Sequence, residues 1–474
     1  MNPVDTILPR QPTFDRLPPE RSESLLPTIR RQLGQTNRSI VVLDDDPTGT
    51  QTVYDTPVLT GWSIEVLADE FSRGTPLFYV LTNSRALSSV KAIELAGEIG
   101  ENLVQAAEST GRDFTVISRS DSTLRGHYPD EVNALLEATG KADAVHVIVP
   151  YFLQGGRFTI DDIHYVAEGD QLVPAAQTPF AKDAAFGFSH SNLIDWVLEK
   201  RGGTMDRSQV VSISLSELRH GSIDRLTERL VCLPSKSVCV VNAVSMSDIE
   251  SFVLASMRAE SLGKQMIYRT AASFVQAYAG LQPKPLLTAR DIGMPNAAAG
   301  LIVAGSYVPK TTTQLSRLVH DAKGLSTVTL NVRSLLEGDA TDIIQATLRE
   351  VSEHLRAGQN VLLQTSRSLV TGSDAVSSLE IGNRISTAIV QVVAGIDVPL
   401  RYLVAKGGIT SSDVATQSLE IKRAMVIGQL LPGVPVWRLQ PESRFPGLPY
   451  IVFPGNVGDE NSLLEAYQKL SDER

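Results

Sequence analysis

The stretch VVLDDDPTGT, residues 41–50, decides the fold because it joins a buried strand directly to a turn of charged and polar residues. The preceding run, residues 40–43, is apolar throughout, which is typical of a strand covered on both faces of a parallel sheet. In an open α/β sheet, ligands bind at the carboxyl ends of the strands. The stretch therefore predicts an α/β fold with a binding site directly after this strand.

Further apolar runs continue the pattern through the first half of the chain, at residues 77–81, 114–117 and 144–149. Amphipathic segments at 90–109 and 129–139 are predicted to be helices between them. Polar clusters follow the runs at once, at 82–85 and 118–121. Strands that alternate with helices predict a layered, mainly parallel sheet. The less regular stretch 151–192 is expected to be a long insertion that folds over a cleft.

A second series of apolar runs begins near Gly300, at residues 301–304, 361–363, 402–405, 434–437 and 450–453. Prolines and a glycine break the segment 281–299, which favours a domain boundary there. Six prolines before residue 38 favour an extended arm over a packed element. We expect an extension at 1–37 and domains at 38–285 and 286–474, each a layered, mainly parallel sheet with helices, with the active site in the cleft between them.

Length, composition and net charge limit the kinds of molecule that this chain is expected to bind. The chain has 474 residues and 42% hydrophobic content, enough for two domains. Its 43 Lys and Arg residues against 53 Asp and Glu residues give a formal net charge of -10, which disfavours nucleic acid and membrane surfaces as partners. No export signal or bilayer-spanning run is evident, so we expect a cytoplasmic protein. Cys232 and Cys239 are expected to be ordinary packing residues.

The aspartate triplet at 44–46 is the strongest local signal for chemistry. Adjacent carboxylates repel one another, which raises the pKa of at least one of them unless cations or donors compensate. A carboxylate prepared in this way serves as a base or a metal ligand. A solvated turn or a helix cap is the alternative explanation.

The second cluster, SDSTLRGH at residues 120–127, follows Arg119 and lies one strand after Arg85. Guanidinium groups beside hydroxyls form a site for a carboxylate, which Arg binds through two parallel hydrogen bonds. A capped helix start with Asp121 or Ser122 as the cap explains the cluster equally well. His127 is either a base or an ordinary hydrogen-bonded histidine.

Glycine-rich turns in the second half are predicted to lie between a strand and a helix, at residues 407–413 and 455–460. Glycines there allow backbone amides to approach a phosphate, although such turns are common. The stretch GSYVPKT, residues 305–311, lacks the glycine before Lys310 that a P-loop requires.

Taken in order, these motifs resemble the four-carbon acid sugar kinase family, which contains 3-oxo-tetronate kinases and D-threonate or D-erythronate kinases. The resemblance runs from Ser39 to about Leu470. The motifs are residues 45–49, 82–85, 121–126, 156–157, 305–306, 407–411, 432–435 and 455–460. The resemblance implies an acid-binding first domain, an ATP-binding second domain with Mg²⁺, and phosphorylation of the 4-hydroxyl of a small anionic sugar acid.

Site residues carry over from the family motif by motif. The residues implied for the acid site are Asp45, Asp46, Arg85, Asp121, Ser122, Thr123, Arg125 and Gly126. The residues implied for ATP are Ser306, Gly407, Gly408, Ile409, Thr410 and Gly455. Within these sets we expect Asp46 to be the catalytic base, with Asp45 orienting it or helping to hold Mg²⁺. We expect Arg85 and Arg125 to bind the substrate carboxylate.

The chain departs from the family pattern at three places. Pro47 replaces the usual Phe, Ile409 replaces the usual Glu, and 307–309 replaces a serine-rich turn. The change at Ile409 puts any role of that glutamate with magnesium in question and leaves the metal ligands unassigned.

Two other functions remain open from the sequence. Residues 44–48 also match the D-x-D-x-T start of haloacid-dehalogenase-type phosphatases, with Asp44 as nucleophile and Asp46 as acid/base, although the required lysine and paired acids are not evident. A non-catalytic sugar-acid-binding protein is the third. The particular acid and the formation of a homo-oligomer stay open.

Overall fold

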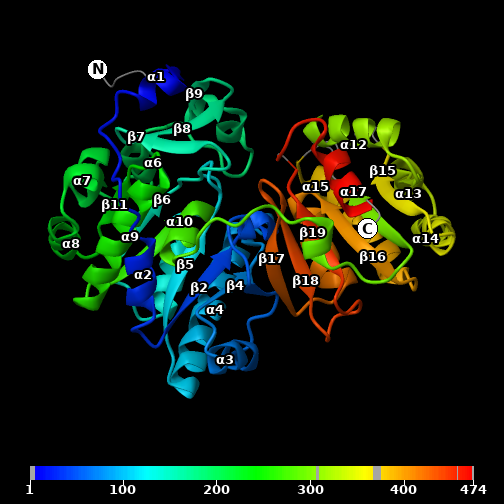
Figure 1. The fold of residues 1–474 in the computed structure, drawn as a ribbon, viewed down its shortest axis with the longest axis horizontal. Coiled ribbons are helices and arrows are strands. Elements are labelled where there is room, and N and C mark those ends of the chain that lie inside the picture. The colour runs from blue at the N-terminus through cyan, green and yellow to red at the C-terminus, as the bar shows by residue number, and fades with distance from the viewer. Residues whose placement is uncertain (1–5, 306–308, 367–374, 456, 472–474) are drawn as a thin grey trace. The chain divides into compact units, whose positions relative to one another are not determined.

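The computed structural model describes residues 6–305, 309–366, 375–455 and 457–471. The chain divides into two compact units. The first contains the chain up to Val53 and Gly61–Pro283; the second contains Tyr54–Thr60 and the chain from Lys284 onward. Both are α/β units with large sheets, as the sequence predicted, and each is described separately below (Figure 1).

The sheet of the first unit runs in the order β10-β11-β6-β12-β5-β2-β4, and neighbouring strands pair in parallel. Its strands are β2 (Arg38–Asp44), β4 (Leu77–Leu81), β5 (Asp113–Arg119), β6 (Val145–Val149), β10 (Val210–Ile213), β11 (Val238–Val241) and β12 (Met266–Thr270). In β2, every residue after Arg38 is buried. The apolar runs of the sequence are therefore the central strands of this sheet.

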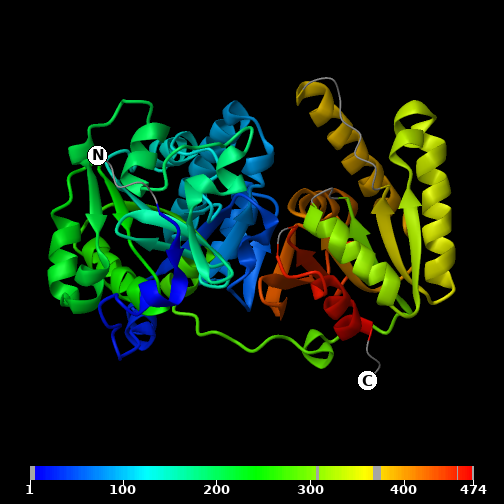
Figure 2. The same cartoon turned by 90° about the horizontal axis from the view of Figure 1, so that it is seen from above.

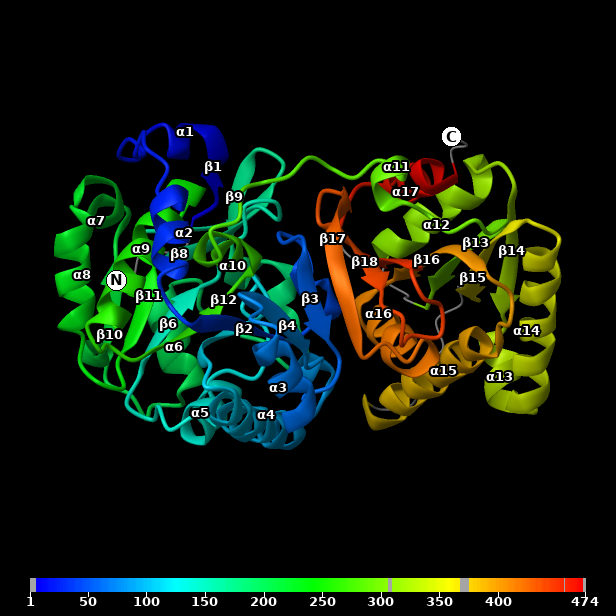
Figure 3. The same ribbon diagram turned by 60° about the horizontal axis from the view of Figure 1, so that its bottom comes forward.

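Helices cover both faces of the first sheet (Figure 3). One face carries α3 (Ile64–Ser72), α4 (Ser89–Thr110) and α5 (Asp130–Ala138), and the other carries α2 (Leu26–Leu33), α9 (Met246–Ser261) and α10 (Ala272–Tyr278). The shorter helices α6 (Leu193–Lys200), α7 (Leu215–His220) and α8 (Ile223–Val231) complete the unit. Helices α4 and α5 pack closely at Gly100, where a Cβ would lie 2.6 Å from Ala138 Cβ.

The N-terminal arm is packed against the first unit, so the expectation of an extended segment was wrong. It contains β1 (Leu8–Pro9), α1 (Arg10–Phe14) and α2. Leu26 and Ile29 of α2 are buried, and α2 contacts α9. Pro27 lies in the first turn of α2, where a missing N–H breaks no helical hydrogen bond, so proline content did not prevent the helix.

The insertion at 151–192 is more regular than the sequence indicated. It forms an antiparallel meander of β7 (Arg157–Ile160), β8 (Ile163–Glu168) and β9 (Gln171–Pro174), and β1 pairs with β9 at its edge (Figure 1). His164 of β8 donates from Nε2 to the carbonyl of Ser122, 2.8 Å away. The meander is therefore tied to the polar loop that follows β5.

The sheet of the second unit has the order β3-β17-β18-β19-β16-β13-β15-β14. Its strands are β3 (Thr56–Leu59), β13 (Ala299–Ala304), β14 (Leu325–Leu330), β15 (Asn360–Thr365), β16 (Leu400–Lys406), β17 (Arg423–Leu431), β18 (Val434–Leu439) and β19 (Pro449–Phe453). Pairing is parallel from β14 to β19 and antiparallel from β19 through β18 and β17 to β3.

Helices of the second unit also lie on both faces of its sheet. One face carries α11 (Ala289–Ile292), α12 (Pro309–Asp321) and α17 (Ser462–Ser471), and α12 and α17 lie side by side (Figure 2). The other face carries α13 (Val332–Glu337), α14 (Ala340–Arg356), α15 (Ala375–Gly395) and α16 (Gly408–Asp413) (Figure 3). Among the described residues, none of the helices is long and apolar enough to cross a bilayer.

Strand β3 joins the second unit although the sequence placed residues 54–60 within the first domain. Leu59 pairs with Arg423 of β17, and Thr56 pairs with Val426. Asp55 also forms an ion pair with Lys284 at 2.7 Å. The pairing gives β17 a hydrogen-bonded neighbour on the side away from β18, which satisfies backbone groups that an edge strand would expose.

Candidate active site

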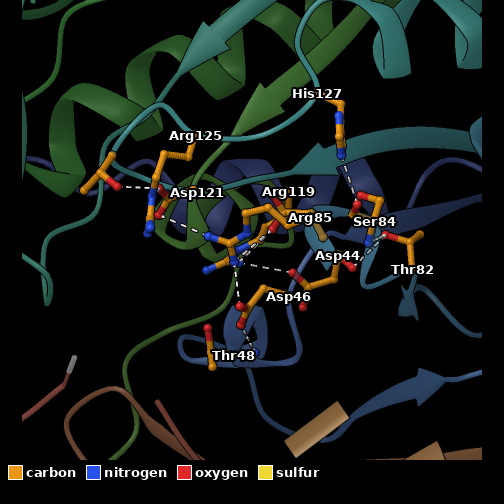
Figure 4. A network of polar contacts seen from close by, with 12 residues as sticks. Asp44, Asp46, Thr48, Thr82, Ser84, Arg85, Arg119, Asp121, Arg125 and His127 are labelled. Carbon is orange, nitrogen blue, oxygen red and sulfur yellow. Dashed lines mark hydrogen bonds and ion pairs between the residues drawn. The ribbon is translucent and has the colours of Figure 1, made fainter. Parts of the chain in front are cut away.

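The predicted acid-site residues gather at the carboxyl ends of β2, β4 and β5. Register explains this, because Asp44 of β2 lies opposite Leu81 of β4 and Arg119 of β5. Parallel strands that end together bring their following loops to one edge of the sheet. Figure 4 shows the resulting network of carboxylates and guanidinium groups.

Asp44 has a structural place in this network. Its side chain is buried and pairs with Arg119 at 3.2 Å. Burial raises the pKa of Asp44 to about 8, and Arg119 acts against that rise. Gly49 packs directly on the carboxylate, because a Cβ at this position would collide with both oxygens of Asp44. This enclosure is unsuitable for a covalent nucleophile, which must be open to its substrate.

Arg85 lies at the centre of the acid cluster (Figure 4). It follows β4 in a short 3-10 turn, Ser84–Ala86. Its guanidinium lies 2.7 Å from Asp46, 3.5 Å from Asp45 and 3.5 Å from Asp121. Burial acts to lower its pKa, but the surrounding carboxylates outweigh this and raise it, so Arg85 is a permanent cation.

The two remaining aspartates of the triplet differ in how their oxygens are used. Asp46 accepts a hydrogen bond from the Thr48 amide at 2.8 Å and pairs with Arg85. Burial acts to raise its pKa, yet Arg85 and Thr48 outweigh burial and lower it. Asp45 is buried, and neither carboxylate oxygen accepts a hydrogen bond from a described residue. Burial raises the pKa of Asp45, with Arg85 and Arg119 acting in opposition.

The loop after β5 carries the rest of the predicted acid site. Asp121 pairs with Arg125 at 2.7 Å and accepts a hydrogen bond from the Thr123 hydroxyl. Burial would raise the pKa of Asp121, but Arg125 and Arg85 hold it well below its usual range. Gly126 has φ +118, and a Cβ there would lie 3.5 Å from Asp45 Oδ2. Ser122 is buried in the same loop.

His127 is a structural residue. Its Nε2 lies 3.1 Å from the carbonyl of Ser84 and 3.1 Å from that of Leu87. Carbonyl oxygens only accept, so this nitrogen carries the proton and holds the turn that positions Arg85. A general base at His127 is therefore not supported.

His164, Phe180 and Arg269 also lie near this site, although the sequence analysis did not select them. Arg157 lies there too, and the sequence analysis named it only as part of the motif at 156–157. Arg269 is the penultimate residue of β12, and its Cζ lies 5.3 Å from the ring centroids of both Tyr128 and Trp196. A charged residue at the end of an apolar run was the signal that could have identified it. For Arg157 the signal was its place in the motif at 156–157. For His164 and Phe180 the signal was weaker, because the fold of the insertion at 151–192 was not predicted.

In the second unit, the glycine turns predicted for ATP meet at the ends of β13, β16 and β19. A Cβ at Gly305 would lie 2.9 Å from Thr410 Oγ1, and the Gly407 amide donates to Phe453 at 2.8 Å. Gly407 has φ +110, a conformation that favours glycine. Gly408 and Thr410 belong to α16, and the Ile409 side chain is 60% exposed. Ser306 lies outside the described residues.

Lys406 is the cation closest in sequence to these turns and was not selected from the sequence. It is fully buried at the end of β16. Its Nζ donates to the carbonyls of Pro454 at 2.6 Å and Gly455 at 3.3 Å. Burial, with Lys310 nearby, lowers the pKa of Lys406 to about 7. A lysine of this kind responds strongly to an added anion.

The described ranges contain no group of three or more His, Cys, Asp and Glu side chains arranged to hold a metal. A Mg²⁺ ion that accompanies a nucleotide needs only one or two protein carboxylates beside phosphate oxygens. Asp45, whose oxygens lack hydrogen-bond donors, fits that smaller requirement.

Comparison with known proteins matches both halves of the chain. A family model described as a sugar-binding N-terminal domain matches residues 40–278, and one described as a nucleotide-binding C-terminal domain matches 301–463. The chain belongs to the four-carbon acid sugar kinase family. Membership makes it a carbohydrate kinase that acts on a sugar acid, as the sequence predicted, with a nucleotide-binding second domain.

Individual relatives in this family are distant. D-erythronate kinase of Heliobacterium modesticaldum is 24% identical over 327 residues, 67% of this chain and 68% of its own length. 3-oxo-tetronate kinase of Pectobacterium atrosepticum is 22% identical over 371 residues, 76% and 81% of the two chains. These identities support a sugar-acid kinase in general and leave its particular substrate to proposal.

Solved structures agree on the fold. A Haemophilus influenzae protein of the family aligns over 90% of this chain and 99% of its own, with a TM-score of 0.61 and 18% identity. A protein from Salmonella typhimurium LT2 aligns over 92% and 100%, with a TM-score of 0.66 and 16% identity. At these identities the likeness shows the fold alone.

Replacing Gly49 with Ala tests the enclosure of Asp44 in this kinase. The added methyl group collides with a buried carboxylate, so we expect Gly49→Ala to lower the free energy of unfolding by about 1–3 kcal/mol. Urea unfolding followed by circular dichroism measures the change. As a control, Gly97→Ala adds a methyl group on α4 with nothing within 4 Å and should raise stability by about 0.5–1 kcal/mol. Unchanged stability in Gly49→Ala would contradict this packing.

Proposed function

We propose that this kinase transfers the γ-phosphoryl group of ATP to the terminal 4-hydroxyl of a four-carbon sugar acid, such as a tetronate or a 3-oxo-tetronate. The observation that carries the proposal is Asp45, a buried carboxylate without a hydrogen-bond donor among the described residues, beside the permanent cation Arg85. A substrate hydroxyl would supply the missing donor. The substrate class rests on the named relatives, which act on D-erythronate and 3-oxo-tetronate.

Within the triplet, the contacts favour Asp45 over Asp46 as proton acceptor. Asp46 is already occupied by Thr48 and Arg85, and its lowered pKa makes it a weak base. Asp45 has a raised pKa and unused oxygens, which are the properties of a carboxylate that can accept a proton. We therefore propose Asp45, in place of Asp46, as the catalytic base. Asp46 then orients Arg85.

The acid would lie among Arg85, Asp121, Arg125 and the Ser122–Gly126 turn, whose hydroxyls and amides can bind its hydroxyl groups. The position of this site in a cleft between the two domains stays a prediction. Phosphoryl transfer demands little covalent work from the protein and depends on alignment and charge neutralisation. Arg85 supplies fixed positive charge next to the carboxylate that accepts the proton.

For the nucleotide, we propose that Gly407–Thr410, Gly455 and Ser306 surround the phosphates of ATP. Support comes from the glycine backbones that meet at the ends of β13, β16 and β19. When bound, Mg²⁺ would neutralise phosphate charge, with Asp45 or Asp46 as the protein ligand. Lys406 would add positive potential beneath the turns through the low-dielectric interior.

A coupled ADP-release assay on the full chain tests the proposed function. The panel contains D-erythronate, D-threonate, their 3-oxo relatives, and five-carbon and branched acids, with the product phosphate located by NMR. We expect turnover with at least one four-carbon acid and phosphate at its 4-oxygen. Turnover confined to five-carbon acids would change the proposed substrate class from four-carbon to five-carbon acids. No turnover with any acid would reject the proposal.

Asparagine variants distinguish the two aspartates. Asp45→Asn keeps the shape and removes the proton acceptor, so kcat should fall by about 10²–10⁴. Asp46→Asn should lower kcat less, because this variant changes only the orientation of Arg85. Steady-state kinetics at saturating acid and ATP give both values. Asp183→Asn, which removes a carboxylate 3.5 Å from Arg125 and outside the triplet, is the control. A larger loss in Asp46→Asn would return the base to that residue.

Proton uptake tests the place of Lys406. Free Lys406 has a pKa of about 7, and nearby phosphates stabilise its charged form and raise that pKa. ATP binding should therefore take up a proton, and ATP affinity should fall as pH rises from about 7 to 8.5. Calorimetry in buffers of different ionisation enthalpy measures the uptake.

The variant Lys406→Met should abolish this pH dependence, while Lys469→Met, on α17, should keep it. Equal proton uptake by wild type and Lys406→Met would show that the nucleotide does not act on Lys406.

A further inference from the structure

Arg157 differs from most arginines around the acid site because no described carboxylate forms an ion pair with it. It begins β7, and its Nη1 donates to the carbonyl of Gly155. Its Nε is buried without a hydrogen-bond partner among the described residues. Burial lowers the pKa of Arg157, and the charges of Asp121 and Glu168 oppose that shift only from a distance. A desolvated cation without a counter-charge is costly, which indicates a partner that is not part of the chain.

The neighbouring arginines are already occupied. Arg85 serves Asp45, Asp46 and Asp121. Arg125 serves Asp121 at 2.7 Å and Asp183 at 3.5 Å. A substrate carboxylate that bound to either would compete with acids already in place, so the net gain would be small. This weakens the expectation that Arg85 and Arg125 bind the substrate carboxylate.

Arg119 and Arg269 are also poorly placed for an incoming acid. Arg119 is buried beneath Asp44 and Asp45. Arg269 has no ion pair with a described residue either. However, it is only 5% exposed, its guanidinium lies near two aromatic rings, and one nitrogen donates to the Arg125 carbonyl at 2.9 Å. Arg157 remains as the half-buried guanidinium whose charge is unmatched.

The meander holds Arg157 next to the loop that carries Arg125. Arg157 Cζ lies 5.7 Å from the ring centroid of Phe180, and Arg125 Cζ lies 5.2 Å from the same ring. The hydrogen bond from His164 to Ser122 fixes β8 to this loop at 2.8 Å. Burial lowers the pKa of His164 to about 4, so the imidazole is neutral and adds no positive charge of its own.

The turn before Arg157 requires its two glycines. Gly156 has φ +69, and a Cβ there would lie 2.9 Å from Ala167 Cβ. A Cβ at Gly155 would collide with Phe152 and would lie 3.1 Å from Arg157 Nη1. The absence of both side chains lets the guanidinium fold back over the turn. Arg157 is thus held in one place before any ligand arrives.

We propose that Arg157 binds the carboxylate of the sugar acid, with Phe180 covering this ion pair from water. This rests on the proposed function, because it takes a sugar acid as the ligand. The planar guanidinium offers two parallel N–H donors to a carboxylate, a geometry that a neutral sugar alcohol cannot use. Arg157 is therefore the residue that selects acids over neutral sugars.

Calorimetry on the full chain without nucleotide tests the proposal, with D-erythronate as the acid and erythritol as its neutral analogue. Arg157→Gln should weaken D-erythronate binding about ten- to hundredfold, as expected for a lost charge-assisted contact, and leave erythritol binding unchanged. Arg157→Lys should lose part of the affinity, because a point charge replaces the fork. Arg207→Gln, which removes an exposed ion pair with Asp195 in the same unit, is the matched control.

Kinetics separate this proposal from the proposed function. For Arg157→Gln, KM for the acid should rise and kcat should largely survive, since the carboxylate contact is the same in ground and transition states. Unchanged acid affinity in an active Arg157→Gln enzyme overturns the Arg157 assignment alone. Acid binding that depends on Arg157 in a chain that phosphorylates no acid overturns the proposed function alone.

Two outcomes remain. A wild-type chain that binds no sugar acid overturns both proposals. Where Arg157→Gln fails to fold, Arg157→Lys decides the question, and unchanged acid affinity in that variant overturns the Arg157 assignment.

Discussion

The parallel pairing of β2 with β4 and β5 is the constraint on which the acid site depends. Its register sets Asp44 opposite Arg119 and Leu81, so three polar loops leave the sheet at one edge. The ion pair between Asp44 and Arg119 closes the end of the strand, and Gly49 packs over it. Because the end of β2 is fixed in this way, the side chains of Asp45, Asp46 and Arg85 have little conformational freedom. Without this pairing, the acid-site residues, which are far apart in the sequence, would no longer lie close together.

Charge balance distinguishes residues that hold the site from residues that are available to a ligand. Asp44, Asp46 and Asp121 each have a cation close by, and Asp46 and Asp121 have lowered pKa values as a result. Their main contribution is to fix the arginines. Asp45 has cations only at 3.5 and 3.7 Å and no hydrogen-bond donor among the described residues, Arg157 has no ion pair there, and both bear the cost of burial. Strain of this kind tends to persist where function requires it.

The sequence predicted the central strands, the two-domain α/β class and the gathering of motifs at strand ends, because apolar runs and polar turns are local signals. It missed the packed arm, where Pro27 is harmless only because it falls in the first turn of α2. It also missed β3, whose place depends on a partner strand hundreds of residues away. The sequence favoured Asp46 as the base, whereas the proposal of Asp45 rests on which oxygens meet Thr48 and Arg85, a detail that the sequence does not contain. These features depend on long-range contacts or on the positions of single atoms, and neither leaves a periodic pattern in the sequence.

The meander at 157–174 connects the fold of the insertion with the charge balance of the acid site. It contributes Arg157, which has no ion pair among the described residues, to the loop region of Asp45, whose oxygens have no hydrogen-bond donor among those residues. A guanidinium without a counter-charge and a carboxylate without a hydrogen-bond donor have opposite needs, so no single simple ion satisfies both. A molecule with a carboxylate for Arg157 and a hydroxyl for Asp45 does satisfy both, and a sugar acid carries the two groups. The same pair of unmet needs would then select the substrate and direct its hydroxyl toward the proton acceptor.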